Sequence, residues 1–203
     1  METVAVLDFE TTGMSPRLGD RPTEIAVVLV CDGRIVDRYQ SLMNPRRPIP
    51  AEITRLTGIT NAMVAGAPPV ATVMREAARF VGDHPLVAHN AAFDQRFWAA
   101  ELETLAVEVP APFACTMLLA RRVYPQLSDH RLSTLVRALA LPRPGRAHRA
   151  MVDAEMTAHL WCRLVADVGA AHGLDTVSHG RLAAAQRAPR QQFSRTLGAC
   201  AAA

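Results

Sequence analysis

The order of short apolar runs and turn signals along the chain restricts the fold more than any other feature. A β-branched stretch at residues 23–31 is separated from a second predicted strand at 34–43 only by Asp32-Gly33, a strong signal for a two-residue hairpin turn. An apolar run at residues 4–7 precedes them and is typical of a buried strand. Helical patterns then alternate with short apolar runs. This order predicts an α/β protein with a mixed sheet, in which an antiparallel hairpin edge is followed by βα units flanked by helices.

Further elements follow from apolar spacing and from the positions of proline and glycine. Strands are expected at residues 85–89 and 113–115, and helices at 52–56, 60–65, 69–81, 91–105, 116–123, 132–141 and 150–170. The periodic pattern weakens from about Gly173 onward. We therefore expect one domain over residues 1–172 and an Arg- and Ala-rich C-terminal tail over residues 173–203.

Composition excludes several classes of protein. Half of the 203 residues are apolar and 20% are charged, which suits a packed core rather than a disordered chain. The longest apolar run, residues 25–31, is far too short to cross a membrane, and no secretory signal is visible. The four cysteines form no CxxC pair, so neither a zinc ribbon nor a disulfide scaffold is supported. A cytoplasmic protein without a membrane partner is expected.

Basic residues, all of them arginine, are unevenly distributed. Residues 111–150 contain seven arginines and a single acid, Asp129, and the last 27 residues contain four arginines and no acid. The segment 1–110 is net acidic. Basic blocks beside an acidic region suggest a polyanionic partner, with cations held by the acids, although a merely solvated Arg-rich surface has the same composition.

Asp8 and Glu10 are the first informative carboxylates. They lie two residues apart on the first predicted strand, so both side chains point to one face of the sheet. Asp8 follows four apolar residues directly, and an ionised carboxylate there is costly unless a metal or hydrogen bonds compensate for it. The alternative is that the strand ends at Leu7 and the acids lie in a solvated turn.

Asp94 falls in the first turn of the helix predicted at 91–105, where the helix dipole favours an anion. His89 and Asn90 lie just before it, at the C-terminal end of a predicted strand, which is where α/β proteins tend to bind ligands. Ordinary charge compensation and a local turn are the alternatives for these residues.

Asp153 is the most informative acid. At about 100° per residue, Leu160 and Leu164 fall on either side of it in one apolar arc of the long C-terminal helix, so Asp153 points toward the core. His148 lies five residues earlier, in a stretch that follows a Pro- and Gly-containing loop. A non-helical His148 would be able to swing over a site beside Asp153, whereas an exposed loop histidine is the alternative.

Four carboxylates and one histidine suit metal-assisted phosphodiester chemistry. Oxygen ligands favour Mg²⁺ or Mn²⁺ over zinc. Two such ions about 4 Å apart would clamp the attacking and leaving oxygens of a phosphodiester. Histidine is the side chain that most often accepts a proton from an attacking water.

Three segments resemble the three exonuclease motifs of the DEDDh 3′–5′ exonucleases. They are Asp8-Phe-Glu-Thr-Thr-Gly13, His89-Asn-Ala-Ala-Phe-Asp94 and His148-Arg-Ala-Met-Val-Asp153, in the expected order and spacing over about residues 3–168. This family includes the proofreading subunit of bacterial replicative polymerases, ribonuclease T and oligoribonuclease. The resemblance implies a ribonuclease-H-like fold, two divalent cations and release of nucleoside 5′-monophosphates.

The resemblance also implies roles for single residues. Asp8, Glu10, Asp94 and Asp153 would be the metal-site acids, and His148 the general base. In similar enzymes the stretch that corresponds to Thr11, Thr12, Gly13 and Met14 holds the terminal nucleotide, and Met14 would be its apolar wedge. Cys115 and Thr57 differ from the residues that many relatives have there, which leaves the subfamily open.

The sequence thus favours a metal-dependent 3′–5′ exonuclease acting on single-stranded DNA, similar to a proofreading subunit. An exonuclease of RNA or short oligoribonucleotides would have the same site, and contacts to a 2′-hydroxyl would separate the two. A nucleic-acid-binding module without catalysis is the alternative from another class. The resemblance offers a further partner, because proofreading subunits bind their polymerase through a C-terminal segment. A merely disordered end is the alternative for this tail, since Arg-rich tails are also generic polyanion grips.

Overall fold

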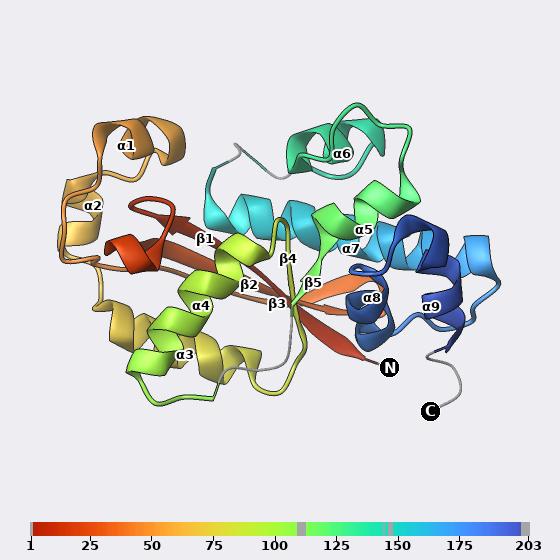
Figure 1. Ribbon diagram of the computed structural model, residues 1–203. Helices are drawn as coiled ribbons and strands as arrows, with labels where there is room; N and C mark the ends of the chain where they lie inside the picture. The colour runs from red at the N-terminus through yellow and green to blue at the C-terminus, as the bar shows by residue number, and fades with distance from the viewer. Residues whose placement is uncertain (1, 109–112, 144, 146–147, 200–203) are drawn as a thin grey trace.

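A computed structural model of the chain describes residues 2–108, 113–143, 145 and 148–199, which form helical layers on both faces of a five-stranded sheet (Figure 1). The strands lie in the order β3-β2-β1-β4-β5. Their bounds are β1 Thr3–Thr11, β2 Pro22–Cys31, β3 Arg34–Leu42, β4 Leu86–Ala88 and β5 Ala114–Cys115. β1 pairs antiparallel with β2 and parallel with β4, so the predicted mixed α/β sheet is confirmed.

The predicted hairpin turn joins β2 to β3. Asp32 and Gly33 both have positive φ, at 51° and 72°, which is the backbone that a type I′ turn requires at its two central residues. Cys31 pairs with Arg34 across the turn, and the register shifts once, between Leu29 and Val30. The hairpin places β2 between β1 and the edge strand β3.

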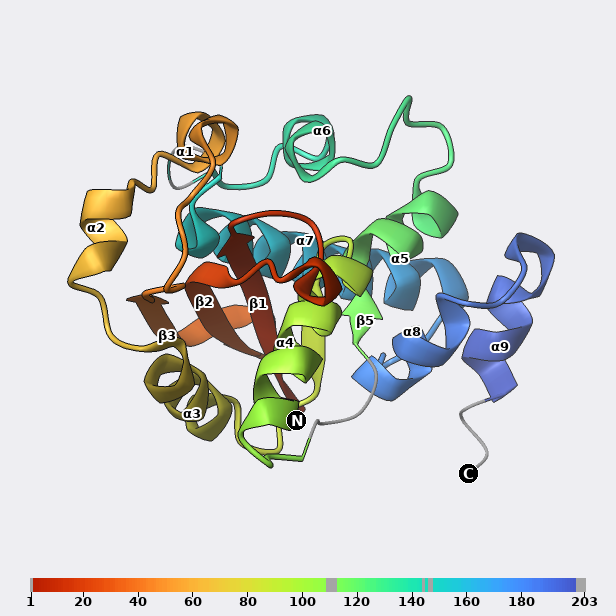
Figure 2. The same ribbon diagram turned by 60° about the vertical axis from the view of Figure 1, so that its left-hand side comes forward.

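Helices cover the two faces of the sheet, as Figure 2 shows from a second direction. α3 and α4 pack on one face, and α5 and α7 pack on the other. The helices are α1 Ala51–Thr57, α2 Asn61–Ala65, α3 Val70–Val81, α4 Ala92–Thr104, α5 Thr116–Val123, α6 Leu132–Ala138, α7 Ala150–His172, α8 His179–Ala185 and α9 Phe193–Ala199, with 3₁₀ turns η1 Pro16–Leu18 and η2 Arg190–Gln192.

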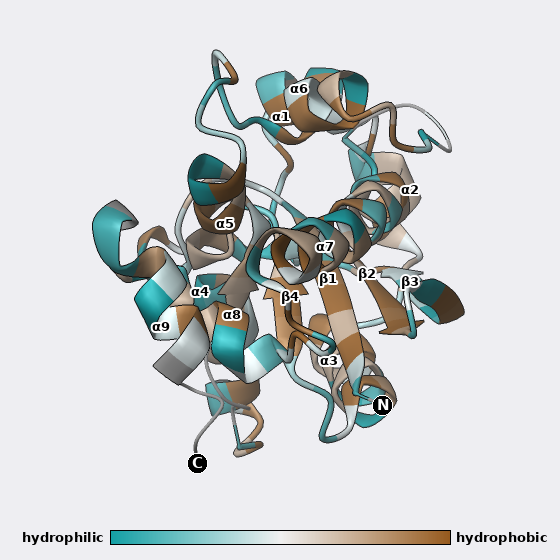
Figure 3. Ribbon diagram, turned by 90° about the vertical axis from the view of Figure 1, so that its right-hand side faces the viewer, coloured by the Kyte–Doolittle hydropathy of each residue, from teal (hydrophilic) through white to brown (hydrophobic). Residues whose placement is uncertain are grey.

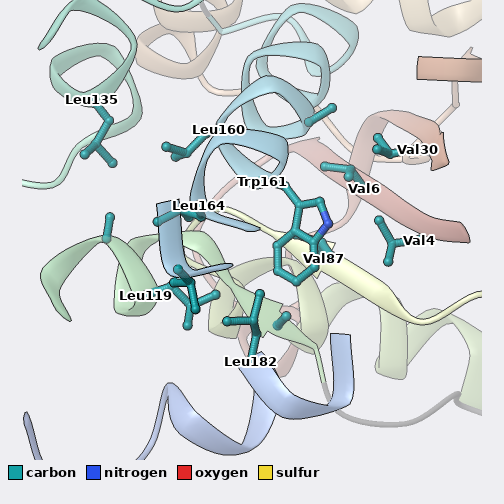
Figure 4. Packing of buried hydrophobic residues seen from close by; sticks show 14 of the residues in the cluster. Val4, Val6, Val30, Val87, Leu119, Leu135, Leu160, Trp161, Leu164 and Leu182 are labelled. Atoms are coloured by element: carbon teal, nitrogen blue, oxygen red, sulfur yellow. The ribbon is translucent and has the colours of Figure 1, made fainter. Parts of the chain in front are cut away.

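Alternation along β1 divides the core between the two faces. Val4 and Val6 pack toward α7, where Trp161 and Leu164 meet them (Figure 4), and Leu7 packs toward α3 and α4. Figure 3 shows the hydrophobic strands behind α7. Each such side chain contributes about 1.5–3 kcal/mol when it is removed from water. Because side chains alternate on a strand, Asp8 and Glu10 share the face of Val4 and Val6 and lie under α7.

The C-terminal segment differs from the predicted tail. Leu182 in α8 and Leu197 in α9 are buried in the same cluster as the side chains of α7. The Gln186 side chain extends the hydrogen bonding at the end of the sheet, because its Oε1 accepts the Cys115 N–H at 2.5 Å and its Nε2 donates to the Phe113 carbonyl at 2.9 Å. The boundary of the catalytic unit at residue 172 stays a prediction.

The reason for this difference is length. α8 and α9 have seven residues each, which is too short for a helical period to stand out in the sequence. Within the part of the chain that the structure describes, no helix is long and apolar enough to cross a membrane.

Candidate active site

β1 positions the first two acids at its C-terminal end. Asp8 and Glu10 point to the same face, and the register places Glu10 opposite Glu24 of β2. Asp8 is partly exposed, whereas Glu10 is 9% exposed. The alternation of side chains that buries Val4 and Val6 therefore places the carboxylates of Asp8 and Glu10 on the same face of the sheet, at the C-terminal end of β1, as the sequence predicts.

Asp94 joins them from α4, on the other side of β1. The parallel pairing of β1 with β4 ends at Val6, and beyond it the Oδ1 of Asp94 accepts the N–H of Phe9 at 3.1 Å. Asp94 is 2% exposed and lies in the first turn of α4. The carboxylate thus takes the place of a neighbouring strand, and this contact fixes it next to Asp8.

Asp153 and His148 reach the site from the start of α7. The Oδ2 of Asp153 accepts the backbone N–H of His148 at 2.8 Å, which ties the residues before the helix to its first turn. His148 is exposed, lies outside the helix and has φ of 64°, so the predicted non-helical position is confirmed. One ligand atom each from Glu10, His148 and Asp153 lie within 4.8 Å of one another.

The carboxylates of this cluster carry more negative charge than the cationic groups around them balance. Burial raises the pKa of Asp8 well above its ordinary value, and the charges of Asp94 and Asp153 add to this effect. Burial, with the charges of Asp153 and Glu24, also raises the pKa of Glu10 to about 8. The pKa of Asp94 is raised by its burial although the Phe9 N–H opposes the shift.

A divalent cation fits this donor set. Carboxylate oxygens are the preferred ligands of Mg²⁺ and Mn²⁺. A buried carboxylate that gains no cation must bind a proton or repel its neighbours, which is the cause of the raised pKa values. The residues that would hold the metal are the four acids Asp8, Glu10, Asp94 and Asp153.

The sequence interpretation missed a further buried acid beside the site, Glu24. Glu24 is fully buried, and its carboxylate accepts hydrogen bonds from Arg149 Nη2 at 2.8 Å, Arg149 Nε at 3.1 Å, the Ala150 backbone N–H at 3.0 Å and Gln40 Nε2 at 2.8 Å. These bonds fix the start of α7, where His148 and Asp153 lie. A signal was present, because a charged residue inside an apolar β-branched strand needs a partner.

The Thr11–Met14 stretch forms a tight loop at the end of β1. The Thr11 hydroxyl donates to the Gly13 carbonyl at 2.5 Å, and the Thr12 hydroxyl accepts the Arg21 N–H at 3.0 Å. A Cβ at Gly13 would lie 2.5 Å from the Asp20 carboxylate, so any other residue there would displace this carboxylate, which accepts the Ser15 N–H at 3.0 Å. Met14 is 67% exposed and stands free of the core, where an apolar wedge would have to be.

An ion pair joins this loop to the helix that bears Asp94. Arg21 donates from Nε and Nη2 to the two carboxylate oxygens of Glu101, at 2.8 and 3.1 Å, and Glu101 is buried in α4. A bidentate pair of this kind has a defined geometry. The loop and Asp94 are therefore held relative to each other, a link that spans 80 residues and left no local signal in the sequence.

His89 and Asn90 occupy the turn between β4 and α4. The Nδ1 of His89 is 2.9 Å from the Thr116 hydroxyl at the start of α5, and burial lowers the pKa of His89 to about 4. Asn90 is exposed with φ of 59°, and its carbonyl accepts the Phe93 N–H. His89 thus joins β4 to α5, whereas Asn90 faces solvent next to the helix of Asp94. Their predicted contact with substrate stays a prediction.

Comparison with known proteins identifies the class. The family model RNase_T, described as "Exonuclease", matches residues 5–161. The solved structure "Exonuclease X in complex with 5′ overhanging duplex DNA" is 30% identical, covers 96% of this chain and 99% of its own, and superposes with a TM-score of 0.69. The chain therefore belongs to the DEDDh exonuclease family and is a 3′–5′ exonuclease, a hydrolase. DEDDh exonucleases use divalent metal ions.

Relatives in bacterial replication enzymes are more similar in sequence. The PolC-type DNA polymerase III of Bacillus subtilis is 41% identical over 168 residues, and that of Bacillus cereus is 40% identical over 168 residues. These matches cover 82% of this chain but only 12% of either polymerase. The chain thus spans about one eighth of the length of these relatives.

Proposed function

We propose that this chain removes nucleotides from the 3′ end of single-stranded DNA and releases nucleoside 5′-monophosphates, in a reaction that needs two divalent cations. The observation that carries the proposal is the meeting of Asp8, Glu10, Asp94 and Asp153, which come from three separate elements. DNA is favoured because the PolC-type relatives are DNA polymerases and because Exonuclease X was solved in complex with DNA.

The four acids would hold the cations. Bound Mg²⁺ or Mn²⁺ would neutralise the carboxylates and polarise the phosphodiester that is cut. Asp94 keeps its orientation through the N–H of Phe9, and Asp153 keeps its own through the N–H of His148. Both acids thus offer their remaining oxygen lone pairs in a fixed direction.

His148 is the residue in position to accept a proton. Its ring nitrogen lies within 4.8 Å of carboxylate oxygens of Glu10 and Asp153, at the exposed side of the cluster where water and substrate enter. The proton of an attacking water would pass to this imidazole and from there to solvent. The exposure of His148 supports this role, because the proton must leave after each cycle.

The terminal nucleotide would lie against the loop after β1. The exposed Met14 side chain would press on the face of the last base. The buried Thr11 and Thr12 would hold this loop in shape through the hydrogen bonds of their hydroxyls. The exposed Asn90 side chain, near the start of α4, would close the other side.

Polymerase association is part of the proposal. The PolC-type relatives contain their matching segment within a polymerase, so a polymerase is the partner that the comparison favours. The segment after residue 172 would provide the contact or, alternatively, grip long strands through its arginines. Its helices α8 and α9 pack on α7. The side chains of these two helices that remain exposed would therefore form the surface that contacts the polymerase or the strand.

The proposal is tested with end-labelled single-stranded DNA, duplex DNA, mismatched primer and RNA, in Mg²⁺, Mn²⁺ and EDTA. We expect nucleoside monophosphates from the 3′ end of DNA, with no cleavage in EDTA. His148→Gln should lower kcat by about 10²–10⁴-fold, the range for loss of a general base, while metal binding by calorimetry is retained.

His84→Gln is the matched control. His84 lies before β4, at the end of this strand that points away from the carboxylates, and the variant should cleave like the wild type. Wild-type rates in His148→Gln would refute the role of this imidazole. Faster cleavage of RNA than of DNA would correct the substrate class, and binding without hydrolysis would leave only a nucleic-acid-binding module.

A further inference from the structure

The arginines of residues 121–149 have different surroundings in the structure. Arg149 is bound to Glu24, and Arg122 donates to the Ala188 carbonyl at 2.7 and 3.2 Å. The guanidinium groups of Arg131, Arg137 and Arg143 form no ion pair with any residue that the structure describes. Only part of this basic stretch is therefore used to hold the fold together.

These three arginines surround one hollow between α6 and the start of α7. The hollow has a volume of about 610 Å³, and the hydroxyls of Ser133 and Thr134 line it as well. No acidic side chain lines it among the described residues. Three like charges around an open hollow repel one another, so an anion that enters it is attracted by all three.

The hollow adjoins the carboxylate cluster. Met156, which lies at its base, is one helical turn beyond Asp153 on α7. The charge of Arg143 also acts on Asp153 and opposes the rise in the pKa of this acid. In Figure 1, α6 lies above α7.

We propose that this hollow binds the backbone phosphates of the substrate strand on the 5′ side of the bond that is cut. This inference rests on the proposed function and extends it, because it states where the strand leaves the site. A strand whose last phosphodiester lies at the acids must carry its next phosphates away from them. The hollow of Arg131, Arg137 and Arg143 is a region of this kind, with cationic side chains and no acidic side chain among its described lining residues.

The test removes the three charges together. Arg131→Gln, Arg137→Gln and Arg143→Gln are combined in one variant, and Arg34→Gln, Arg75→Gln and Arg79→Gln in a matched control whose exposed arginines lie away from α6. Binding of a fluorescent single strand is measured by anisotropy in EDTA over a series of salt concentrations. Hydrolysis of a nitrophenyl ester of a nucleoside monophosphate reports the catalytic centre alone.

We expect the first variant to bind the strand on the order of tenfold more weakly, with a slope of log K against log salt that is smaller by about 2, as loss of three phosphate contacts predicts. Ester hydrolysis should stay at the wild-type rate. The same three positions changed to lysine should restore the slope, and the control variant should match the wild type.

Two outcomes separate this inference from the proposed function. Strand binding and a salt slope equal to those of the wild type in the Gln variant would overturn the inference, whatever the rates of hydrolysis are. A wild-type protein that binds the strand but hydrolyses neither substrate would overturn the proposed function while the binding data still decide on the hollow. A loss that is equal in the control variant would show a general charge effect and would also overturn the inference.

Discussion

Glu10 and Glu24 lie directly opposite each other on β1 and β2, on the same face of the sheet, and yet their surroundings differ. Glu24 is fully buried and accepts four hydrogen bonds, two of them from Arg149. Glu10 is 9% exposed, and among the described residues no side chain or N–H donates a hydrogen bond to it. Burial instead raises its pKa to about 8.

The fold itself supplies the hydrogen-bond partners of the Glu24 carboxylate. Within the described part of the chain it supplies none to the Glu10 carboxylate, which is left to bind a ligand. A buried polar group with all its partners fixes the local structure. A buried acid without partners destabilises the protein until a cation arrives, and such strain is common where chemistry takes place. The Cβ atoms of these two glutamates lie about 5 Å apart on neighbouring strands. Glu24 thus stabilises the fold, whereas Glu10 serves the proposed reaction.

The variant Glu10→Gln has the largest expected effect among the tests of this comparison between Glu10 and Glu24. The amide keeps the shape of the side chain but removes a charged metal ligand, so activity should fall on the order of 10³-fold or more. Without metal the variant should be at least as stable as the wild type, because the amide needs neither a proton nor a cation in order to be buried there. Steady-state kinetics and thermal unfolding measure both effects.

Glu103→Gln, an exposed position on α4, serves as the control for Glu10→Gln and should change neither quantity. A Glu10→Gln protein with ordinary activity would show that this acid is not needed for the proposed metal chemistry.

Glu24→Gln should have the opposite pattern. It weakens the pair with Arg149 and should cost about 1–3 kcal/mol of the free energy of unfolding, the range for a lost charged hydrogen bond. Activity should fall by only about tenfold, through displacement of His148 at the start of α7. This loss should appear in kcat rather than in the affinity for the strand, because Glu24 acts through Arg149 and the Ala150 N–H at the start of α7.

A double variant makes this prediction sharper. Replacing Arg149 by Met in Glu24→Gln removes both halves of the pair, and the coupling free energy from the cycle should be favourable. Independent effects of the two substitutions would show that the pair does not position the start of α7.

The smallest expected effect is a pH dependence of stability in the metal-free protein. The folded state raises the pKa of Glu10 to about 8, so it holds more protons than the unfolded chain between about pH 4 and pH 8. The stability of the protein in EDTA should therefore fall as the pH rises through this window, which thermal unfolding over a series of pH values measures as a decrease in Tm. Mg²⁺ should reverse the decrease, most strongly at about pH 8.

Glu10→Gln should make this pH dependence shallower without removing it, because burial also raises the pKa of Asp8 and of Asp94. Glu24→Gln should leave most of it in place. If the Tm of the wild-type protein in EDTA rises across this same pH window, the raised pKa values of the buried acids are wrong.

Much of the site could be predicted because its residues follow local periods. Alternation along β1 places Asp8 and Glu10 on one face, and the helical period turns Asp153 toward the sheet. The pairs Glu24–Arg149 and Arg21–Glu101 could not be predicted, because their partners lie 125 and 80 residues apart and meet only after the sheet forms. The short helices α8 and α9 were missed because their packing on α7, rather than their own pattern, makes them stable.

The hydrogen bond from Phe9 to Asp94 decides which inactive form of the protein is suited to capturing a bound strand. Replacement of Asp94 by alanine would leave a buried N–H on β1 without an acceptor, at a cost of about 1–3 kcal/mol. Asparagine retains an oxygen at the same position and removes only the charge. An Asp94→Asn protein would therefore keep the end of β1 in place while it holds an uncut DNA end, and this makes it the form of choice for crystals of a substrate complex.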